Sequence, residues 1–372
     1  MASTIRALTN TAGDRRRFIN LEWDIYRDNP CWVPPLKLDR HTILNPEKHP
    51  YHDHATSQLF LAEEDGEPIG RIAAHVNHAH NEFWNESVGF FGFFECINDQ
   101  AIADALFEAA SEFLRHHRCT HIRGPFNWST NEECGLLIDT FDEPPVIMMP
   151  YNHPYYLDLL EQTGLEKSKD LLAYQIKDAE MIPDRLARGV EILKKRYEFS
   201  LRPLNMKRFW DDVELIKDLY NSAWSANWGA VPMSDAEIEH LAKELKLIVD
   251  PDLCYIAESD GEVVGFSVTL PDANRALAPA NGRLFPLGLF RILWNMRKID
   301  YVRVLLLGVV DEYRNHGIDT AMYYETFKRG MAKGYYSGEM SWILEDNHSM
   351  RNALEKMGAY PHKTYRIYEQ QL

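Results

Sequence analysis

The chain has 372 residues, of which 45% are apolar and 26% charged, and this length and composition favour a globular protein with two cores. Its formal net charge is −16, which argues against nucleic acid or an anionic membrane as the main partner, since both need a basic footprint. Five scattered cysteines without a CxxC pair and a polar N-terminus without a signal peptide predict a cytoplasmic protein with reduced thiols.

The first half of the chain predicts a series of short, regular elements. Two strands flank the turn residues Asp65 and Gly66, which are typical of a tight hairpin. The remaining elements follow in chain order: a strand at 88–95, a helix at 100–118, a strand at 121–126, a helix at 154–164 and a strand at 170–176. The helix at 100–118 carries apolar residues at helical spacing, which predicts that one of its faces is buried.

The middle of the chain predicts a boundary between domains. Residues 177–205 are rich in charge, contain two prolines, and place Leu186, Val190 and Leu193 at helical spacing. We interpret this segment as a surface helix that connects two domains. The predicted division is an N-terminal domain at 1–180, a helical connector at 181–203 and a C-terminal domain at 204–372.

The second half repeats the order of the first. Its predicted elements are a hairpin around Asp260 and Gly261, a strand at 302–310, a helix from about Gly317, a strand at 339–345, a helix at 347–356 and a strand near 364–369. Hairpin, strand, helix, strand, helix and strand therefore occur twice. This predicts a duplicated α/β (α+β) unit, each copy a mixed, mostly antiparallel sheet flanked by helices.

The turn after the strand at 302–310 is the main candidate for chemistry. A helix N-terminus offers unpaired backbone N–H groups and partial positive charge, so it attracts anions. Arg314 lies at the mouth of the turn, and Gly317 permits a close approach of the backbone to a ligand.

The sequence Arg314-x-x-Gly317 between a strand and a helix resembles the pyrophosphate loop of the GNAT N-acetyltransferase superfamily, usually written Q/R-x-x-G-x-G/A. Asn347 and the later Lys356, Gly358 and Ala359 resemble the motif that follows it in that family. In the first half, the stretches 89–95, 124–137 and 142–156 resemble a bacterial group of tandem GNAT-like proteins. That half has no R-x-x-G-x-G turn, so we expect it to keep the fold without binding the cofactor.

The resemblance implies CoA-dependent acyl transfer, with acetyl-CoA or another acyl-CoA as co-substrate and a small-molecule or peptide amine as acceptor. Asn347 would contact the pantetheine side, and the chemistry would lie in the C-terminal domain. The residues that would bind the cofactor in the turn are Val309, Val310, Arg314, Asn315, His316, Gly317, Ile318 and Asp319.

Two residues depart from the family pattern. Asp319 stands where the loop usually has glycine or alanine, so its carboxylate either repels the pyrophosphate or caps the helix in place of an anion. Leu354 stands where many members of the family have the tyrosine that protonates the CoA thiolate. Both departures support the alternative hypothesis, a non-catalytic GNAT-fold binding or regulatory protein.

The remaining candidates line the implied acceptor side. Glu345 and Asp311 follow the two strands that separate around the cofactor in this family, and either is a candidate general base. Trp224, Asn227 and Trp228 are candidates for the acceptor pocket, although packing of the tryptophans against the other domain is an equal alternative.

No metal, nucleic acid or membrane partner is expected, and the oligomeric state stays open. The histidines at 49–54 and 75–80 do not repeat a known metal-ligand spacing. The insert at 281–298 predicts an amphipathic helix that covers the acceptor cleft or fills the space between the domains. Its modestly basic flanks make attachment to a membrane surface the weaker interpretation.

Overall fold

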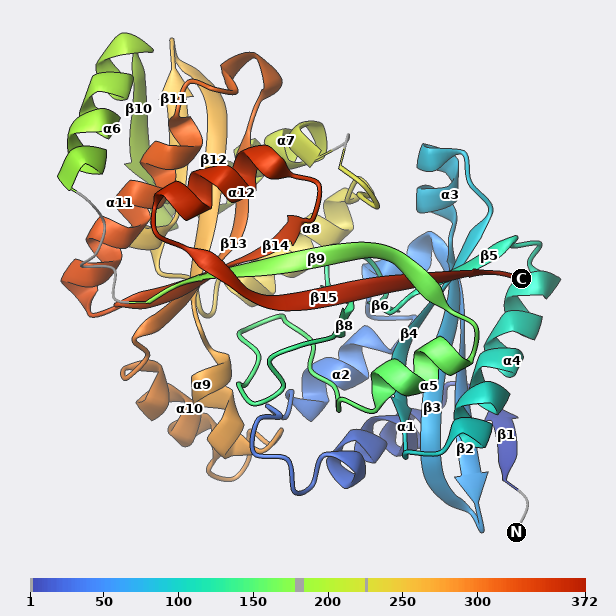
Figure 1. Cartoon of the computed structure of the whole chain (residues 1–372). Helices are drawn as coiled ribbons and strands as arrows, with labels where there is room; N and C mark the ends of the chain where they lie inside the picture. Colours follow the sequence, from blue (N-terminus) through green and yellow to red (C-terminus); the bar gives the residue numbers. More distant parts are fainter. Residues whose placement is uncertain (1–2, 178–183, 225–226) are drawn as a thin grey trace. The chain divides into compact units, whose positions relative to one another are not determined.

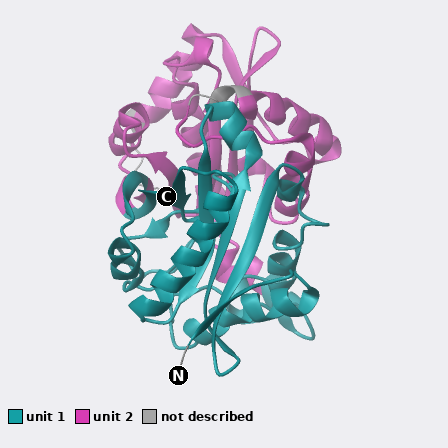
Figure 2. Ribbon diagram, turned by 90° about the vertical axis from the view of Figure 1, so that its right-hand side faces the viewer, with its two compact units in different colours: residues 1–171, 277–293, 363–372 teal, residues 172–276, 294–362 magenta. Residues whose placement is uncertain are grey.

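The computed structural model describes residues 3–177, 184–224 and 227–372. These residues form two compact units (Figure 2). Unit 1 contains residues 1–171, 277–293 and 363–372, and unit 2 contains residues 172–276 and 294–362. Two long strands, β9 (Glu166–Ile176) and β15 (Tyr360–Gln371), have residues in both units. The chain therefore passes between its units inside strands as well as in loops.

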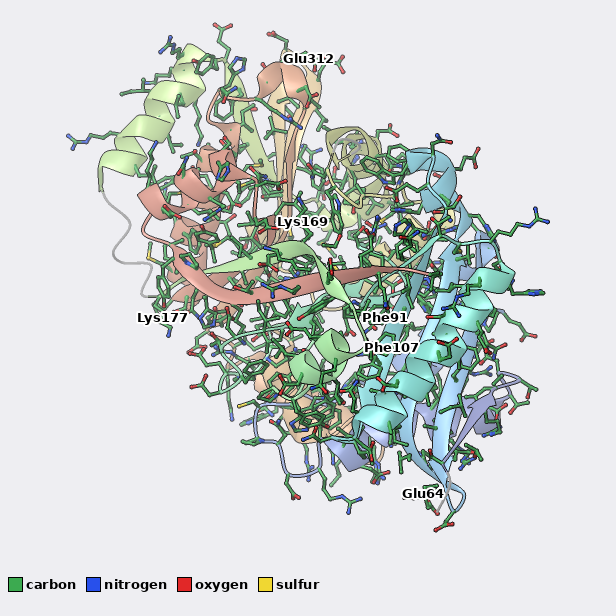
Figure 3. The ribbon with its side chains drawn as sticks, turned by 45° about the vertical axis from the view of Figure 1, so that its right-hand side comes forward. Glu64, Phe91, Phe107, Lys169, Lys177 and Glu312 are labelled. Atoms are coloured by element: carbon green, nitrogen blue, oxygen red, sulfur yellow. The ribbon has the colours of Figure 1, made fainter. Side chains whose placement is uncertain are left out.

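Unit 1 is built on a sheet with the order β1-β2-β3-β4-β5, joined at its β5 side by the end of β15 (Figure 1). The strands are β1 (Thr4–Ala7), β2 (Ala55–Glu64), β3 (Glu67–Asn77), β4 (Val88–Cys96) and β5 (His121–Gly124). Only the β4–β5 pair is parallel in this series. The tight turn at Asp65 and Gly66 joins β2 to β3, as predicted, and Glu64 lies at the tip of this hairpin (Figure 3).

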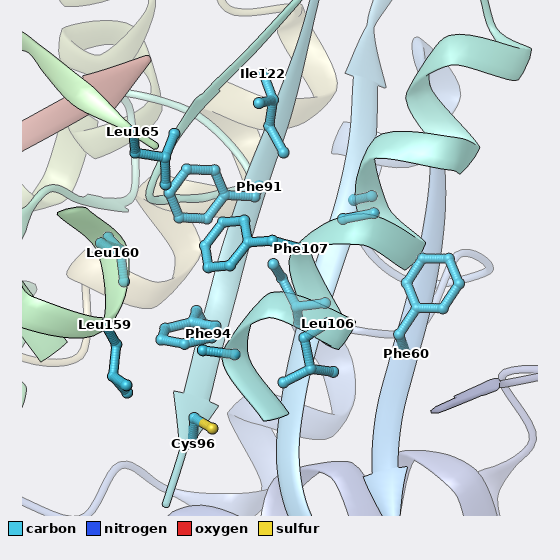
Figure 4. Close-up of a cluster of buried hydrophobic side chains, with 14 of the residues drawn as sticks. Phe60, Phe91, Phe94, Cys96, Leu106, Phe107, Ile122, Leu159, Leu160 and Leu165 are labelled. Atoms are coloured by element: carbon cyan, nitrogen blue, oxygen red, sulfur yellow. The ribbon is translucent and has the colours of Figure 1, made fainter. Parts of the chain in front are cut away.

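Helices cover both faces of this sheet. They are α1 (Ala12–Ile25), α2 (Lys37–Ile43), α3 (His78–Trp84), α4 (Gln100–His116) and α5 (Tyr156–Gln162). Successive strand residues point to opposite faces, so Phe60 packs with the α4 side while Leu61 packs with the α1 side. Phe91 of β4 and Phe107 of α4 point toward one another, with ring centroids 4.9 Å apart (Figures 3 and 4). The predicted apolar face of the helix at 100–118 is confirmed.

Three short strands and the first part of helix α10 (Gly288–Met296), up to Leu293, complete unit 1. The strands β6 (Phe126–Asn127) and β7 (Glu133–Cys134) pair with each other, and β8 (Leu136–Leu137) pairs with β15. Helix α10 lies in the predicted insert. The backbone N–H of Lys37 donates to the carbonyl of Gly282 (3.1 Å), and Trp23 Nε1 donates to Asn281 Oδ1 (3.0 Å). These bonds hold the start of the insert against the N-terminal helices.

Unit 2 repeats the arrangement with the strand order β10-β11-β12-β13-β14. The strands are β10 (Phe199–Pro203), β11 (Tyr255–Ser259), β12 (Glu262–Pro271), β13 (Tyr301–Val309) and β14 (Ser337–Leu344). Again only one pair, β13–β14, is parallel. The mixed, mostly antiparallel α/β architecture predicted for both halves is confirmed.

The helices of unit 2 also lie on two faces of the sheet. They are α6 (Asp184–Arg196), α7 (Phe209–Trp224), α8 (Asp235–Leu245), α9 (Asn274–Leu277), α11 (Ile318–Lys333) and α12 (His348–Lys356). Helices α6 and α11 share a buried cluster that includes Val190, Ile318 and Met322. Val190 is completely buried, so α6 is part of the core of unit 2 and more than the surface connector that the sequence predicts.

Candidate functional site

The two parallel strands of unit 2 separate partway along their length. Cα partners run from Tyr301 and Ser337 to Val304 and Met340, and the pairing ends there although both strands continue. A register shift against β12 occurs at the same level, because Val268 pairs with Leu306 and Thr269 with Val304. Leu305 is therefore the extra residue of a β-bulge, which bends its strand away from a neighbour. Beyond Val304 and Met340, therefore, β13 and β14 continue without pairing with each other.

A buried pair of charged residues lies next to the point where β13 and β14 stop pairing. Arg303 and Glu339 are direct cross-strand partners, and each side chain is about 1% exposed. Arg303 donates to Ser341 through Nε (3.1 Å to Oγ) and Nη2 (3.2 Å to the carbonyl), and Ser341 Oγ donates to Glu339 Oε1 (2.8 Å). Because buried charges need such partners, this network fixes the last paired residues and the point at which the strands part.

The turn after β13 leads directly into the N-terminus of helix α11. A short 3₁₀ turn covers Asp311–Tyr313, and Asn315 and Gly317 then adopt left-handed conformations with φ of 67° and 75°. Helix α11 begins at Ile318, and its first intrahelical bond joins Ala321 N–H to the Gly317 carbonyl (2.9 Å). The N–H groups before Ala321 have no backbone carbonyl acceptor within the helix, so they form the positive end of the helix dipole.

Helix α6 packs directly on this turn. A Cβ on Gly317 would lie 2.5 Å from Leu193 Cδ1, and the ring of Tyr197 stacks on His316 with centroids 4.3 Å apart. The guanidinium of Arg196 lies 5.2 Å from the centre of the Tyr197 ring. Gly317 is thus favoured by its backbone angle, and a side chain there would also require the end of Leu193 to shift. The same contacts bring the basic last turn of α6 next to the loop.

Two of the charged side chains in the turn, Arg314 and Asp311, pair with each other, and Asp319 bonds to the backbone at the start of the helix. Arg314, which is exposed, forms an ion pair with Asp311 (2.8 Å). Asp319 Oδ1 accepts from the backbone N–H of Thr320 (2.7 Å), so this carboxylate already occupies part of the helix N-terminus. This geometry fits the capping role weighed for Asp319 in the sequence. Glu312 adds a further exposed acid in the same turn (Figure 3).

The predicted residues after β14 lie at the N-terminus of the last helix. Asn347 is the N-cap of α12, and its Oδ1 accepts from Met350 N–H (3.1 Å). The carbonyl of Glu345 accepts from Arg351 Nη1 (2.6 Å), which tethers this connection. Since β13 and β14 are parallel, Asp311 and Glu345 follow the same edge of the sheet.

Leu354, the residue in place of the usual tyrosine, is completely buried in the core of unit 2. Tyr323 of α11 directs its hydroxyl at Met350 Sδ of α12 (3.5 Å), so a phenol does lie between these two helices. Burial raises the pKa of Tyr323 well above its usual value, which keeps the phenol protonated.

An apolar cavity of about 80 Å³ lies between α7, α8 and the sheet of unit 2. Leu306, the residue after the bulge, is one of its walls, so the cavity adjoins the strand that separates from β14. Its lining is almost entirely carbon: Leu204, Phe209, Val213, Ile216, Lys217, Tyr220, Met233, Ile238, Leu241, Ala242, Leu245, Val249, Cys254, Val268 and Leu306. A space of this kind accommodates hydrocarbon rather than a polar group.

The three predicted pocket residues lie at the end of α7 and in the loop that joins it to α8. Trp224 ends α7, but its side chain is outside what the structure describes. Asn227 and Trp228 lie in the α7–α8 loop, where the Asn227 carbonyl accepts from Ala230 N–H (3.1 Å). They are not among the residues that line the apolar cavity. Asn221 fastens this loop to α7 through both backbone groups of Met233 (3.0 and 3.2 Å).

In unit 1 the corresponding opening is filled. Pairing of β4 with β5 ends at Phe90 and Arg123, and β6 then packs onto β4. A Cβ on Gly92 would lie 1.7 Å from the carbonyl oxygen of Phe126, and Phe93 N–H donates to Asn127 Oδ1 (2.7 Å). In unit 1, therefore, the chain itself fills the space where the two parallel strands part.

Sequence reasoning missed several residues around the site. Arg303 and Glu339 interrupt two otherwise apolar strands, and paired charges in buried strands were an available signal. The role of Leu193 and Tyr197 had no local signal, because it depends on contacts with a turn more than 100 residues away. Within the described residues, no three His, Cys, Asp or Glu side chains are arranged to hold a metal ion.

Comparisons with solved structures show the fold. A tandem GNAT protein from the clavulanic acid biosynthesis pathway aligns with 100% of this chain and 98% of its own, with a TM-score of 0.59 and 13% identity. A GCN5-related N-acetyltransferase from Sphaerobacter thermophilus aligns with 99% of this chain and 95% of its own, with a TM-score of 0.52 and 13% identity. These identities are too low to carry more than the fold.

Sequence comparisons extend over the whole chain. Protein YghO of Escherichia coli (strain K12) is 37% identical over 366 residues, which cover 96% of this chain and 93% of that protein. The bacterial ceramide synthase of Caulobacter vibrioides is 36% identical over 373 residues, which cover 97% of this chain and 96% of that protein. The model of the acetyltransferase (GNAT) family matches residues 213–359, which include the separated strands and the turn. The chain therefore belongs to the GNAT acyltransferase family, in the tandem form with two such units.

Proposed function

We propose that this protein transfers an acyl group from acyl-CoA to the amino group of a long-chain amine, with the chemistry in unit 2. The observation that carries the proposal is the separation of β13 and β14 beyond Val304 and Met340, followed by the left-handed turn into α11. An open strand edge can pair with the amides of pantetheine, and the turn presents N–H groups to pyrophosphate. Membership of the GNAT family supports the same co-substrate.

The class of acceptor rests on two further observations. One relative of nearly the same length is named a ceramide synthase, and a ceramide is the amide of a long-chain base. The apolar cavity beside Leu306 has a volume of about 80 Å³, below the ~300 Å³ of a typical ligand pocket, so it would take only a few methylene groups of the chain, and its lining offers almost no polar partner. A long-chain amine fits both observations better than the small or peptide amine that the sequence alone left open.

In the proposed reaction the amine nitrogen attacks the thioester carbonyl, the C–S bond breaks and an amide forms. The amine loses a proton and the CoA thiolate gains one. Backbone N–H groups at 317–319 and the guanidinium of Arg314 would hold the pyrophosphate, and exposed Lys195 and Arg196 of α6 would add positive charge beside it.

The proton acceptor and donor are proposed separately. Glu345 is favoured over Asp311 as the base, because Asp311 is largely exposed and already paired with Arg314. With Leu354 unable to donate a proton, water is the proposed donor to the thiolate, because the phenol of Tyr323 is buried against Met350 and its raised pKa makes it a weak acid.

A titration with acyl-CoA tests the site. We expect acetyl-CoA or palmitoyl-CoA to raise the melting temperature of the wild type, because a ligand that binds only the native state stabilises it by about 2.7 kcal/mol at a hundredfold excess over Kd. Arg314→Ala should weaken this effect through loss of a charge-assisted contact. Asp319→Ala should strengthen it, because the competing carboxylate is removed from the helix N-terminus.

A parallel assay of amide formation, with a long-chain base as acceptor, separates catalysis from binding. Stabilisation by acyl-CoA without amide product for any acceptor would support the alternative, a GNAT-fold binding or regulatory protein. Absence of stabilisation by every acyl-CoA would overturn the proposal at its first step.

Filling the apolar cavity tests the acceptor class. Ala242→Leu places three extra carbons in the cavity, so we expect unchanged or slightly raised thermal stability, within about 1 kcal/mol. Transfer to a long-chain amine should fall roughly tenfold or more, while transfer to a short amine is retained. Ala236→Leu, on the same helix but outside the cavity lining, is the matched control. Equal rates for both chain lengths in Ala242→Leu would remove the hydrocarbon site from the proposal.

A further inference from the structure

The insert at 281–298 exposes an unusual amount of apolar surface. Six large apolar side chains are between 41% and 78% exposed in α10 and the residues just before it: Phe285, Leu287, Leu289, Phe290, Leu293 and Trp294. Soluble proteins rarely leave such residues together in water, and a contiguous patch of this kind marks a surface that binds something apolar. We call these six residues the α10 patch.

The patch sits on an ordered and anchored segment. Leu289 N–H donates to the Leu284 carbonyl (2.8 Å), and Arg283 N–H donates to the Ala280 carbonyl (3.0 Å). Gly288 is buried within the segment, and a Cβ on Gly282 would lie 2.4 Å from Trp23. The base of the insert is therefore packed in unit 1, and the apolar side chains are held outward by that packing.

The charge of the insert differs in sign from that of the chain. Residues 281–298 contain four basic and no acidic side chains, in a protein of net charge −16. Arg283, Arg291, Arg297 and Lys298 are all exposed, and Lys298 Nζ lies 5.5 Å from the centre of the Trp294 ring. At a lipid surface, the cations would contact the phosphate groups, and the exposed leucine, phenylalanine and tryptophan side chains would contact the hydrocarbon beneath them.

No helix among the described residues has the length and hydropathy needed to cross a bilayer.

We propose that α10 is an interfacial anchor, with the α10 patch buried in the headgroup and acyl boundary of a membrane that contains anionic phospholipid. We favour a membrane over a protein partner because the 9-residue apolar helix is accompanied by four basic side chains. An apolar surface of another protein would not need these cations. This revises the expectation from sequence, which set membrane attachment aside because of the low basic content of the flanks. The number of charges was visible there, but the outward direction of the apolar side chains was not.

Flotation with lipid vesicles tests the proposal. The full-length protein should float with vesicles of phosphatidylglycerol and phosphatidylcholine, and the double variant Phe290→Ser with Leu293→Ser should lose binding roughly tenfold or more. Leu247→Ser is the matched control, since Leu247 is 85% exposed in unit 2, outside the insert, and should leave binding unchanged. Because the replaced side chains are exposed, circular dichroism and melting temperature should match the wild type.

A second set of variants tests the charge. Arg291→Gln, Arg297→Gln and Lys298→Gln together should abolish the preference for phosphatidylglycerol over phosphatidylcholine alone and reduce the salt dependence of binding. The experiment contains no acyl-CoA, so its result is independent of whether the protein is a transferase. Failure of the wild type to float with anionic vesicles would overturn the proposal. Dimerisation that Phe290→Ser and Leu293→Ser abolish, without vesicle binding, would assign the patch to a second copy of the chain.

Discussion

Replacing Arg71 by methionine is expected to cost unit 1 about 3–5 kcal/mol of unfolding free energy, measured by chemical denaturation at neutral pH. Arg71 is the buried cation of a cluster that contains Glu22 and Glu95. It forms an ion pair with Glu22 and lies 3.7 Å from Glu95. Its other donors reach the backbone carbonyls of Phe18 (2.6 Å) and Phe93 (3.1 Å). Methionine preserves much of the volume but leaves two carboxyl groups without their cation.

The loss should depend on pH in a defined direction. Burial raises the pKa of Glu95 to about 7, more than the charge of Arg71 lowers it. A carboxyl with a raised folded-state pKa contributes stability below its unfolded value, near 4.5, and loses that contribution as pH rises through about 7. Removing Arg71 raises this pKa further, so the cost of Arg71→Met should be larger at pH 8 than at pH 5.5, where protonation neutralises the carboxyl.

Two variants control for this interpretation. Arg115→Met removes an exposed arginine of the same unit, paired with Glu108 at 2.9 Å, and should cost less than about 1 kcal/mol. Adding Glu22→Gln to Arg71→Met removes one orphaned charge and should restore part of the lost stability. A cost for Arg71→Met that is the same at both pH values, and that Glu22→Gln does not reduce, would mean that lost packing rather than charge accounts for it.

Most of the fold was predictable because its signals are local. Asp65 with Gly66 and Asp260 with Gly261 specify tight hairpins, since each of these four residues adopts a positive φ. The alternation that places Phe60 and Leu61 on opposite faces is likewise encoded in the strand itself. Repetition of the same order of elements then predicted two similar units without any knowledge of contacts between distant residues.

The parts that sequence reasoning left out depend on contacts between distant residues. The bulge at Leu305 follows from pairing with β12, and the sequence "VLLLG" does not mark which leucine is extra. The exposure of Phe290 follows from how the insert packs in unit 1, and a helical pattern alone is the same for a buried face as for an exposed one. The filled opening at Gly92 likewise depends on Phe126, which lies 34 residues further along the chain.

The turn at Gly317 depends both on a local signal, the glycine itself, and on a contact with a distant residue, Leu193. Gly317→Ala is therefore the second substitution for which we expect a large effect. A side chain at φ 75° costs about 1–2 kcal/mol in a left-handed conformation. The new Cβ would also lie 2.5 Å from Leu193 Cδ1, and such overpacking costs about 1–3 kcal/mol. We therefore expect a loss of about 2–5 kcal/mol in unfolding free energy, together with loss of stabilisation by acyl-CoA, since either α6 or the turn has to move.

Gly261→Ala separates these two contributions, because Gly261 has a similar φ of 85° and no atom within 4 Å of a new Cβ. It should cost only the backbone strain, about 1–2 kcal/mol, and keep the response to acyl-CoA. In a double-mutant cycle, Leu193→Ala should recover at least about 1 kcal/mol of the cost of Gly317→Ala, because it removes the atom that the new Cβ meets. Equal costs for the two glycine variants, with no coupling to Leu193, would mean that α6 does not constrain the turn. The basic end of α6 would then lose its proposed place beside the pyrophosphate.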